Sequence, residues 1–204
     1  MTGRLLIATN NAGKVDELRD LLAEAGIQPV TPREIGLSLE VEEDGSTYAE
    51  NASKKAKLFA QASGLLSLAD DSGLEVEALG GAPGLYSARY SPKAGATDAD
   101  RREFLLQNLR AAQAPPPWEA RFHATLALAM PGGRVELAEG FCSGEIITEE
   151  RGTGGFGYDP IFLLPELGLT MAELGREAKN RLSHRGRALR AALPLLETMF
   201  MDEG

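Results

Sequence analysis

Two adjacent carboxylates, Asp70 and Asp71, are the side chains in this sequence best suited to chemistry. They follow a short apolar run, residues 65–69, and precede a Ser-Gly pair, so we expect a buried strand that ends at the aspartates. Neighbouring like charges repel each other, and a divalent cation held by oxygen ligands commonly offsets that repulsion. A solvated acidic turn would explain the pair equally well. The rest of the chain has to decide between the two interpretations.

The N-terminal segment predicts a turn that binds an anion. An apolar run at residues 4–8 predicts the first strand, and apolar residues recur at helical spacing from Val15 to a stop at Gly26. The polar turn between them, residues 9–14, ends in Lys14, whose charge adds to the anion preference of a helix start. It lacks the second glycine and the Ser or Thr of a Walker A motif, so a plain capped helix is the alternative. Residues 27–30 predict a second, short strand.

An acidic run, residues 40–45, precedes a predicted helix that extends to about residue 63. Thr47 and Glu50 have the spacing of a capping box at its start. Lys54 is predicted to pair outward with Glu50. Lys55 lies beside the apolar face of this helix, where a lysine usually extends its ammonium group to solvent. It is also a candidate phosphate contact.

Between the aspartates and the C-terminal third, the pattern predicts regular elements. Residues 74–79 alternate like a strand, and Thr97 predicts the cap of a helix over residues 98–113. Two long strands, residues 120–130 and 135–147, are joined by a Pro-Gly-Gly hairpin. His123 lies in the first of them, and a packed core position is the expected role of a lone histidine there.

The glycine-rich loop, residues 151–160, is the second distinctive stretch. Phe156 stands between Gly155 and Gly157, so its ring has few neighbours on its own chain and is a candidate platform for a base. The alternative is a surface loop with an anchoring aromatic residue.

Two cations, His184 and Arg185, begin the last predicted helix. Cations at a helix start oppose the helix dipole, and a ligand that carries acceptors or negative charge would remove that conflict. The pair is therefore a candidate ligand contact.

Composition excludes several classes of protein. The chain has 204 residues, of which 43% are hydrophobic, enough for one domain or two closely packed lobes. A net charge of −9 argues against a nucleic-acid partner. Cys142 is the single cysteine, which rules out an internal disulfide and a cysteine-built metal site. No stretch reads as a signal peptide or a membrane span, so we expect a cytoplasmic protein without a membrane partner.

Seven segments together resemble one family, the noncanonical purine nucleoside triphosphate pyrophosphatases, or inosine/xanthosine triphosphatases of the Ham1 type. Any one of the segments is weak evidence, but all seven occur in the family's order and run from residue 9 to residue 186. They are Thr9-Asn10-Asn11-Ala12-Gly13-Lys14, Thr47 through Lys55-Ala56, Ala69-Asp70-Asp71-Ser72-Gly73-Leu74, Gly80-Gly81-Ala82-Pro83-Gly84, Ser87-Ala88-Arg89-Tyr90, Gly152 through Asp159-Pro160, and Ser183-His184-Arg185-Gly186.

The resemblance implies an α/β fold, with an elongated mixed β-sheet, flanking helices and two lobes around a central nucleotide-binding cleft. It implies a single nucleoside triphosphate pyrophosphatase domain over residues 1–204 that works as a homodimer. The implied reaction, with Mg²⁺, is hydrolysis of inosine, deoxyinosine and xanthosine triphosphates to the monophosphate and pyrophosphate, which removes deaminated purines from the nucleotide pool.

The resemblance also implies roles for individual residues. Asp71 would be the catalytic base and, with Glu43, a metal ligand; Glu42 is an alternative to Glu43, and Asp70 is a possible further ligand. A further hypothesis comes from the residues themselves: His184 and Arg185, two donors at a helix start, would bond to a 6-oxo group and so reject adenosine triphosphate. The residues expected to bind substrate are Thr9, Asn10, Asn11, Lys14, Lys55, Ser72, Phe156, Gly157, Tyr158, Asp159, Lys179, His184 and Arg185.

Two rival functions remain at this point. One is a pyrophosphatase of the related septum-inhibition class, which prefers other bases. The other is a non-enzymatic nucleotide sensor, which would need Lys14 and Phe156 but not the paired aspartates. A panel of triphosphates and an assay of pyrophosphate release separate the three.

Overall fold

The computed structural model describes residues 4–202, which form two compact units. The described part of unit 1 comprises residues 4–71, 124–140 and 184–202, and unit 2 comprises residues 72–123 and 141–183. The helices are α1 (Ala12–Glu24), α2 (Tyr48–Ser63), α3 (Asp98–Ala111), α4 (Arg176–Leu182) and α5 (His184–Asp202). None of these helices is long and apolar enough to cross a membrane.

Within residues 4–202, six strands form one mixed sheet in the order of the sequence. They are β1 (Leu5–Ile7), β2 (Leu66–Val76), β3 (Trp118–Ala129), β4 (Val135–Ile146), β5 (Phe162–Leu164) and β6 (Leu169–Thr170). β1 pairs with β2 in parallel, whereas β5 is antiparallel to both β4 and β6. Strands β2, β3 and β4 are long enough to belong to both units. The predicted α/β class with a mixed sheet and flanking helices is confirmed.

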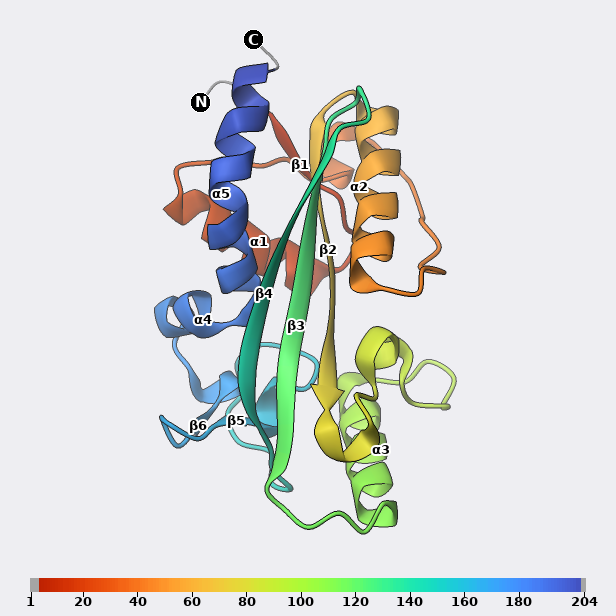
Figure 1. Cartoon of the computed structure of the whole chain (residues 1–204), viewed down its shortest axis with the longest axis vertical. Helices are drawn as coiled ribbons and strands as arrows, with labels where there is room; N and C mark the ends of the chain where they lie inside the picture. The colour runs from red at the N-terminus through yellow and green to blue at the C-terminus, as the bar shows by residue number, and fades with distance from the viewer. Residues whose placement is uncertain (1–3, 203–204) are drawn as a thin grey trace. The chain divides into compact units, whose positions relative to one another are not determined.

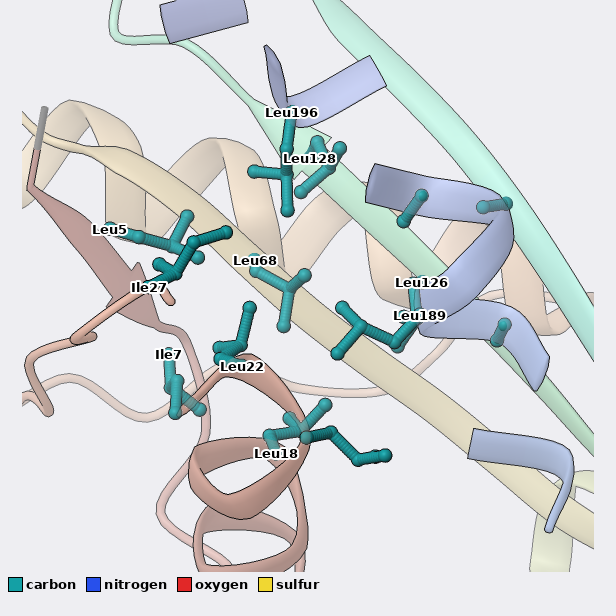
Figure 2. Packing of buried hydrophobic residues seen from close by; sticks show 14 of the residues in the cluster. Leu5, Ile7, Leu18, Leu22, Ile27, Leu68, Leu126, Leu128, Leu189 and Leu196 are labelled. Carbon is teal, nitrogen blue, oxygen red and sulfur yellow. The ribbon is translucent and has the colours of Figure 1, made fainter. Parts of the chain in front are cut away.

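In unit 1 the strands are covered on both faces, because successive side chains of a strand point to opposite sides. Leu5, Ile7, Leu66 and Leu68 pack with the apolar faces of α1 and α5. Leu6, Ala8 and Ala69 pack with the apolar face of α2. Figure 1 shows α2 on one side of these strands and α1 with α5 on the other, and Figure 2 shows leucine and isoleucine side chains of the first cluster gathered between the strands and α1 and α5.

Unit 2 has one apolar cluster of its own. The inward face of α3, with Leu105, Leu106 and Leu109, packs there against alternate residues of four strands. The strand residues are Leu74 and Val76 of β2, Trp118, Ala120 and Phe122 of β3, Cys142 and Ile146 of β4, and Phe162 and Leu164 of β5. The opposite side of β3 carries His123, which stacks on Phe141 with ring centroids 4.2 Å apart and lies 3.3 Å from Glu75. His123 is thus a half-buried residue on the side of β3 away from the core cluster, and not the packed core residue that the sequence suggested.

Two strand predictions were wrong. β2 does not end at the aspartates; it continues through Gly73 to Val76, so the two expected strands are one. Residues 27–30 form no strand, and only Val30 makes an isolated bridge, to Leu6. Pro29 has no amide hydrogen to donate, which limits pairing there to the one residue.

The predicted helix starts were nearly correct. Thr97 and Asp100 form a complete capping box on α3. At α2, Thr47 accepts from the amide of Glu50, but the Glu50 carboxylate accepts from Ser46 instead of closing the box. Lys54 pairs with Asp44, not with Glu50 as the helical spacing suggested.

Candidate functional site

The paired-aspartate site consists of Asp70, Asp71 and the side chains that contact them. Because β2 runs through both residues without interruption, their side chains point to opposite faces of the sheet. Asp70 contacts Lys14 of α1 and Arg185 of α5, on the face that Leu68 also occupies. Asp71 contacts side chains of α2, on the face that Ala69 occupies. The two carboxylates therefore have separate surroundings within unit 1.

Asp70 is completely buried and paired with cations. Its Oδ2 accepts hydrogen bonds from Arg185 Nε at 3.0 Å and Nη2 at 2.9 Å, and Lys14 Nζ lies 3.1 Å away. Burial alone would raise the pKa of Asp70, but the charges of Arg185, Lys14 and Lys55 outweigh it and hold that pKa well below its usual range. Asp70 is therefore ionised at neutral pH.

Arg185 has a second carboxylate partner. It is 2% exposed, and its Nη1 donates to Glu17 of α1. Burial lowers the pKa of Arg185, and the charges of Asp70 and Glu17 more than reverse that effect. The negative charge that offsets a cation at this helix start is thus supplied by the protein itself. Contact between Arg185 and a ligand stays a prediction, and the helix-dipole argument no longer requires it.

Asp71 is held from α2. Asn51 Nδ2 donates to its Oδ2 at 3.1 Å, and Lys55 Nζ lies 3.6 Å from its Oδ1. Burial raises the pKa of Asp71, and the nearby charge of Glu43 adds to that rise against the opposite effect of Lys55 and Lys14. A carboxylate with a raised pKa is the stronger proton acceptor, which suits a general base.

The ammonium group of Lys55 is surrounded by oxygen atoms. Lys55 is buried, and its Nζ donates to Glu43 Oε1 and to the carbonyl oxygen of Asp70, both at 2.7 Å. The sequence expectation that Lys55 reaches solvent was wrong. Glu43, not the exposed Glu42, is turned towards this group.

The donor set around Lys55 fits a hard divalent cation. Two carboxylates, Glu43 and Asp71, converge on one positive charge, and Mg²⁺ typically takes one or two carboxylates together with phosphate oxygens and water. Among residues 4–202, no three His, Cys, Asp or Glu side chains gather so that they could hold a metal by themselves. A cation here would need oxygens from a ligand to complete its coordination.

Local hydrogen bonds organise the turn before α1. Asn11 caps the helix, since its Oδ1 accepts from the amide of Lys14 at 3.1 Å. Thr9 Oγ1 accepts from the amide of Asn11 at 3.2 Å, and Asn10 Nδ2 donates to the carbonyl oxygen of Leu39. Burial lowers the pKa of Lys14, although the charge of Asp70 opposes that shift. The turn therefore presents amide groups and one partly shielded ammonium group.

In unit 2, the glycine-rich loop places Phe156 beside a cation. Asp159 Oδ2 accepts from the amide of Phe156 at 3.0 Å and from Lys179 Nζ at 2.7 Å. Lys179 Nζ lies 5.6 Å from the centroid of the Phe156 ring, which is half-buried. A side chain at Gly155 would place its Cβ 2.0 Å from Asp159 Oδ2, so only glycine allows this close approach.

The remaining predicted site residues lie close to these groups along the chain. Tyr158 is buried, and its hydroxyl donates to the carbonyl oxygen of Ser87, so its side chain anchors the loop in the core of unit 2. His184 is the buried first residue of α5, next to Arg185. Ser72 follows Asp71 in β2 and is half-buried.

The sequence interpretation missed four side chains that hold these groups: Glu17, Asn51, Asp98 and Arg102. Asn51 carried a signal, because a buried amide on an apolar helix face needs a hydrogen-bond partner. Glu17 and the two α3 residues carried none, since surface positions of a helix commonly hold charges.

Comparison with known proteins identifies relatives over nearly the whole chain. The model of the Ham1 family matches residues 5–195. A dITP/XTP pyrophosphatase of Desulforamulus reducens is 48% identical over 200 residues, 98% of each chain, and one of Thermus thermophilus is 50% identical over 93% of this chain and 90% of its own. The solved structure of a HAM1 protein from Coxiella burnetii matches with a TM-score of 0.83 at 40% identity, covering 98% of this chain and 100% of its own. The chain therefore belongs to the Ham1 family.

Proposed function

We propose that this protein hydrolyses noncanonical purine nucleoside triphosphates, namely inosine, deoxyinosine and xanthosine triphosphates, to the monophosphate and pyrophosphate. The observation that carries the proposal is the paired-aspartate site, where one aspartate is fully charge-paired and its neighbour has a raised pKa beside a second carboxylate. The names of the relatives, dITP/XTP pyrophosphatases at 48–50% identity, support the substrate class.

Asp71 is the proposed general base. Its raised pKa and its hydrogen bond from Asn51 support a carboxylate that accepts a proton from the attacking water while its orientation is fixed. Lys55 holds the side chain of Glu43 and the backbone of Asp70 close by. Hydrolysis of a phosphoanhydride depends mainly on positioning and charge stabilisation, which these neighbours supply.

Glu43 and Asp71 are the proposed Mg²⁺ ligands, and the ion would neutralise charge on the phosphate oxygens. Asp70 is assigned a different role, because its Oδ2 already accepts from Arg185 and contacts Lys14. Its charge opposes the lowering of the Lys14 pKa that burial causes. We assign Lys14, with Thr9, Asn10 and Asn11, to the phosphate groups; Lys55 and Ser72 are assigned to the same end of the substrate.

The glycine-rich loop is the proposed base platform. Phe156 offers a stacking face to any purine, which gives affinity without selectivity. Lys179 lies beside that ring and donates a hydrogen bond to Asp159. We assign it as a donor to an acceptor atom on the stacked base. Tyr158 and Gly157 fix the loop, and His184 and Arg185 complete the proposed selection of a 6-oxo group. A homodimer remains part of the proposal, and analytical ultracentrifugation of the full chain tests it.

The decisive experiment is to incubate the protein with inosine triphosphate and Mg²⁺ and to identify the released phosphate species. We expect pyrophosphate and inosine monophosphate, with much slower release from adenosine triphosphate. Release of orthophosphate would contradict the proposed bond cleavage. Faster turnover of pyrimidine triphosphates would favour the septum-inhibition class, and tight binding without any release would favour a sensor.

A further inference from the structure

The backbone of Gly157, next to Phe156, is held by side chains of α3. The amide of Gly157 donates to Asp98 Oδ2 at 2.7 Å, and its carbonyl oxygen accepts from Arg102 Nη1 at 2.7 Å. Both residues lie in the first turns of α3, far from the loop in sequence. The carbonyl and the amide of one residue are thus fixed from the same helix.

Arg102 and Asp98 are themselves held in place. Arg102 is 9% exposed, and its Nε and Nη2 donate to the two carboxylate oxygens of Glu150 at 2.8 Å each. Glu150 directly precedes the glycine-rich loop, so Arg102 connects the start of the loop to Gly157, the residue after Phe156. Asp98 also accepts from Arg101. A bidentate guanidinium–carboxylate pair fixes orientation as well as distance.

Three consecutive peptide groups around Phe156 are consequently bonded to side chains. The amide of Phe156 donates to Asp159, the amide of Gly157 donates to Asp98, and the Gly157 carbonyl accepts from Arg102. Gly157 has φ +62°, a conformation that most residues disfavour, so the loop would not adopt this path by local preference. Because the peptide planes on both sides of Phe156 are fixed, the direction in which its side chain leaves the backbone is fixed too.

We propose that Asp98 and Arg102 are positioning residues that, through the backbone of Gly157, set the Phe156 ring for stacking on the purine base. This α3 clamp rests on the proposed function, which assigns Phe156 to the base. It gives α3 a part in substrate affinity although neither side chain needs to touch the substrate. Loosening the clamp weakens base stacking and leaves the phosphate chemistry unchanged.

The test uses two variants. The first combines Arg102→Met with Glu150→Gln, so that the partner charge is removed together with the arginine, and the second is Asp98→Ala. We expect KM for inosine triphosphate to rise roughly tenfold, within the range that loss of one base-stacking contact covers, with kcat within about twofold of wild type. Calorimetric binding of inosine monophosphate should weaken equally, whereas inhibition by inorganic tripolyphosphate, which has no base, should not change. Asp98→Asn keeps an acceptor for the Gly157 amide and should restore affinity.

Arg110→Met is the matched control, because Arg110 lies on the same helix in a 3.6 Å pair with Glu103, and both side chains are more than half exposed. In a Phe156→Ala background the clamp variants should have no further effect on inosine monophosphate binding. Should Arg102→Met with Glu150→Gln fail to fold, Arg102→Lys replaces it in the same cycle.

If the clamp variants weaken inosine monophosphate binding by the same factor with and without Phe156→Ala, the clamp proposal is wrong. It is also wrong if the clamp variants bind inosine monophosphate as tightly as the Arg110→Met control. A Phe156→Ala variant with unchanged affinity would also overturn it. The proposed function fails by a separate result, namely no pyrophosphate release from inosine triphosphate by the wild-type enzyme. Binding of inosine monophosphate needs no hydrolysis, so the two failures are distinguishable.

Discussion

The paired-aspartate site and the glycine-rich loop both hold a candidate functional group in a fixed position, but they do so with different kinds of interaction. In the first, charged side chains from β2, α1, α2 and α5 neutralise one another in the core of unit 1. In the second, side chains of unit 2 hold the backbone of a segment that has little regular structure. Damage to the first should therefore appear as a loss of stability, chemistry or phosphate binding, and damage to the second mainly as a loss of affinity for the base.

Removing Arg185 should give the largest effect. Arg185→Ala removes the shared partner of Asp70 and Glu17 and leaves Lys14 as the remaining ion-pair partner of Asp70. Removing one partner of a buried ion pair typically destabilises a protein by about 3–5 kcal/mol. Arg187→Ala, an exposed arginine on the same helix, is the control. Urea unfolding measures both, and equal stability of the two variants would mean that the pairs around Asp70 contribute little.

The same variant separates two roles for Arg185. If it only holds Asp70, inosine and adenosine triphosphates should lose catalytic efficiency by the same factor. If it reads the base, the inosine substrate should lose more, as the sequence interpretation predicted.

Asp71→Asn should abolish most of the chemistry while the fold persists, because the two side chains are nearly isosteric. The rate should fall by about 10² or more if the proton-accepting and metal-binding roles are both lost. Steady-state assays at saturating Mg²⁺ check this, with circular dichroism to confirm folding. Turnover near that of the wild type would contradict the assignment.

Lys14→Ala should weaken binding of the triphosphate by about 1.5–3 kcal/mol, the usual contribution of a charge-assisted hydrogen bond. Binding of the bare nucleoside should hardly change. Lys54→Ala, which removes an exposed ammonium paired with Asp44, is the control in the same calorimetric titration. Equal losses for nucleoside and triphosphate would exclude the phosphate role.

Two glycines of the loop should respond differently to alanine. A Cβ at Gly157 meets nothing within 4 Å, so Gly157→Ala adds only the strain of a positive φ, about 1–2 kcal/mol. A Cβ at Gly155 would also lie 2.0 Å from Asp159 Oδ2 and 2.6 Å from Lys179 Nζ. Gly155→Ala should thus weaken inosine monophosphate binding more than Gly157→Ala, and the reverse order would show that the Asp159–Lys179 pair does not shape the site.

The smallest expected effect concerns pH and Asp98. Burial raises the pKa of Asp98, but hydrogen bonds from Arg101 and the Gly157 amide outweigh it, so the folded pKa lies below the unfolded value of about 3.9. The contribution of ionised Asp98 to the free energy of unfolding is then complete above the unfolded pKa and is lost as pH falls through the folded pKa. Because Asp98 is partly exposed, we expect less than about 1 kcal/mol. Melting temperatures between pH 6 and pH 3 should fall less steeply for Asp98→Asn than for the wild type.

The sequence predicted α1, α2, α3, α5, β3 and β4 to within a few residues because their apolar periodicity is strong. It did not predict the short helix α4, and it divided β2 into two strands. It also singled out both stretches of the candidate site, since paired aspartates and clustered glycines are rare enough to stand out. It failed where a tertiary contact overrides a local signal: Gly73 suggested a strand end, yet Lys14 and Arg185 remove the charge conflict at Asp70 and let β2 continue. The partner of Arg185 was equally hidden, because Asp70 and Glu17 lie 115 and 168 residues away along the chain.

Because β2 is uninterrupted, its two aspartates have identical side chains but different surroundings. A carboxylate one position along the strand is on the other side of the sheet, with other helices as neighbours, so neither aspartate can serve as a spare for its twin. Deleting a single residue between Leu66 and Ala69 would keep the Asp-Asp dipeptide in the sequence but would move each carboxylate to the opposite face of the sheet. In this strand, the role of each aspartate depends on the face of the sheet to which it points. A motif search would still find the Asp-Asp dipeptide in the deletion variant.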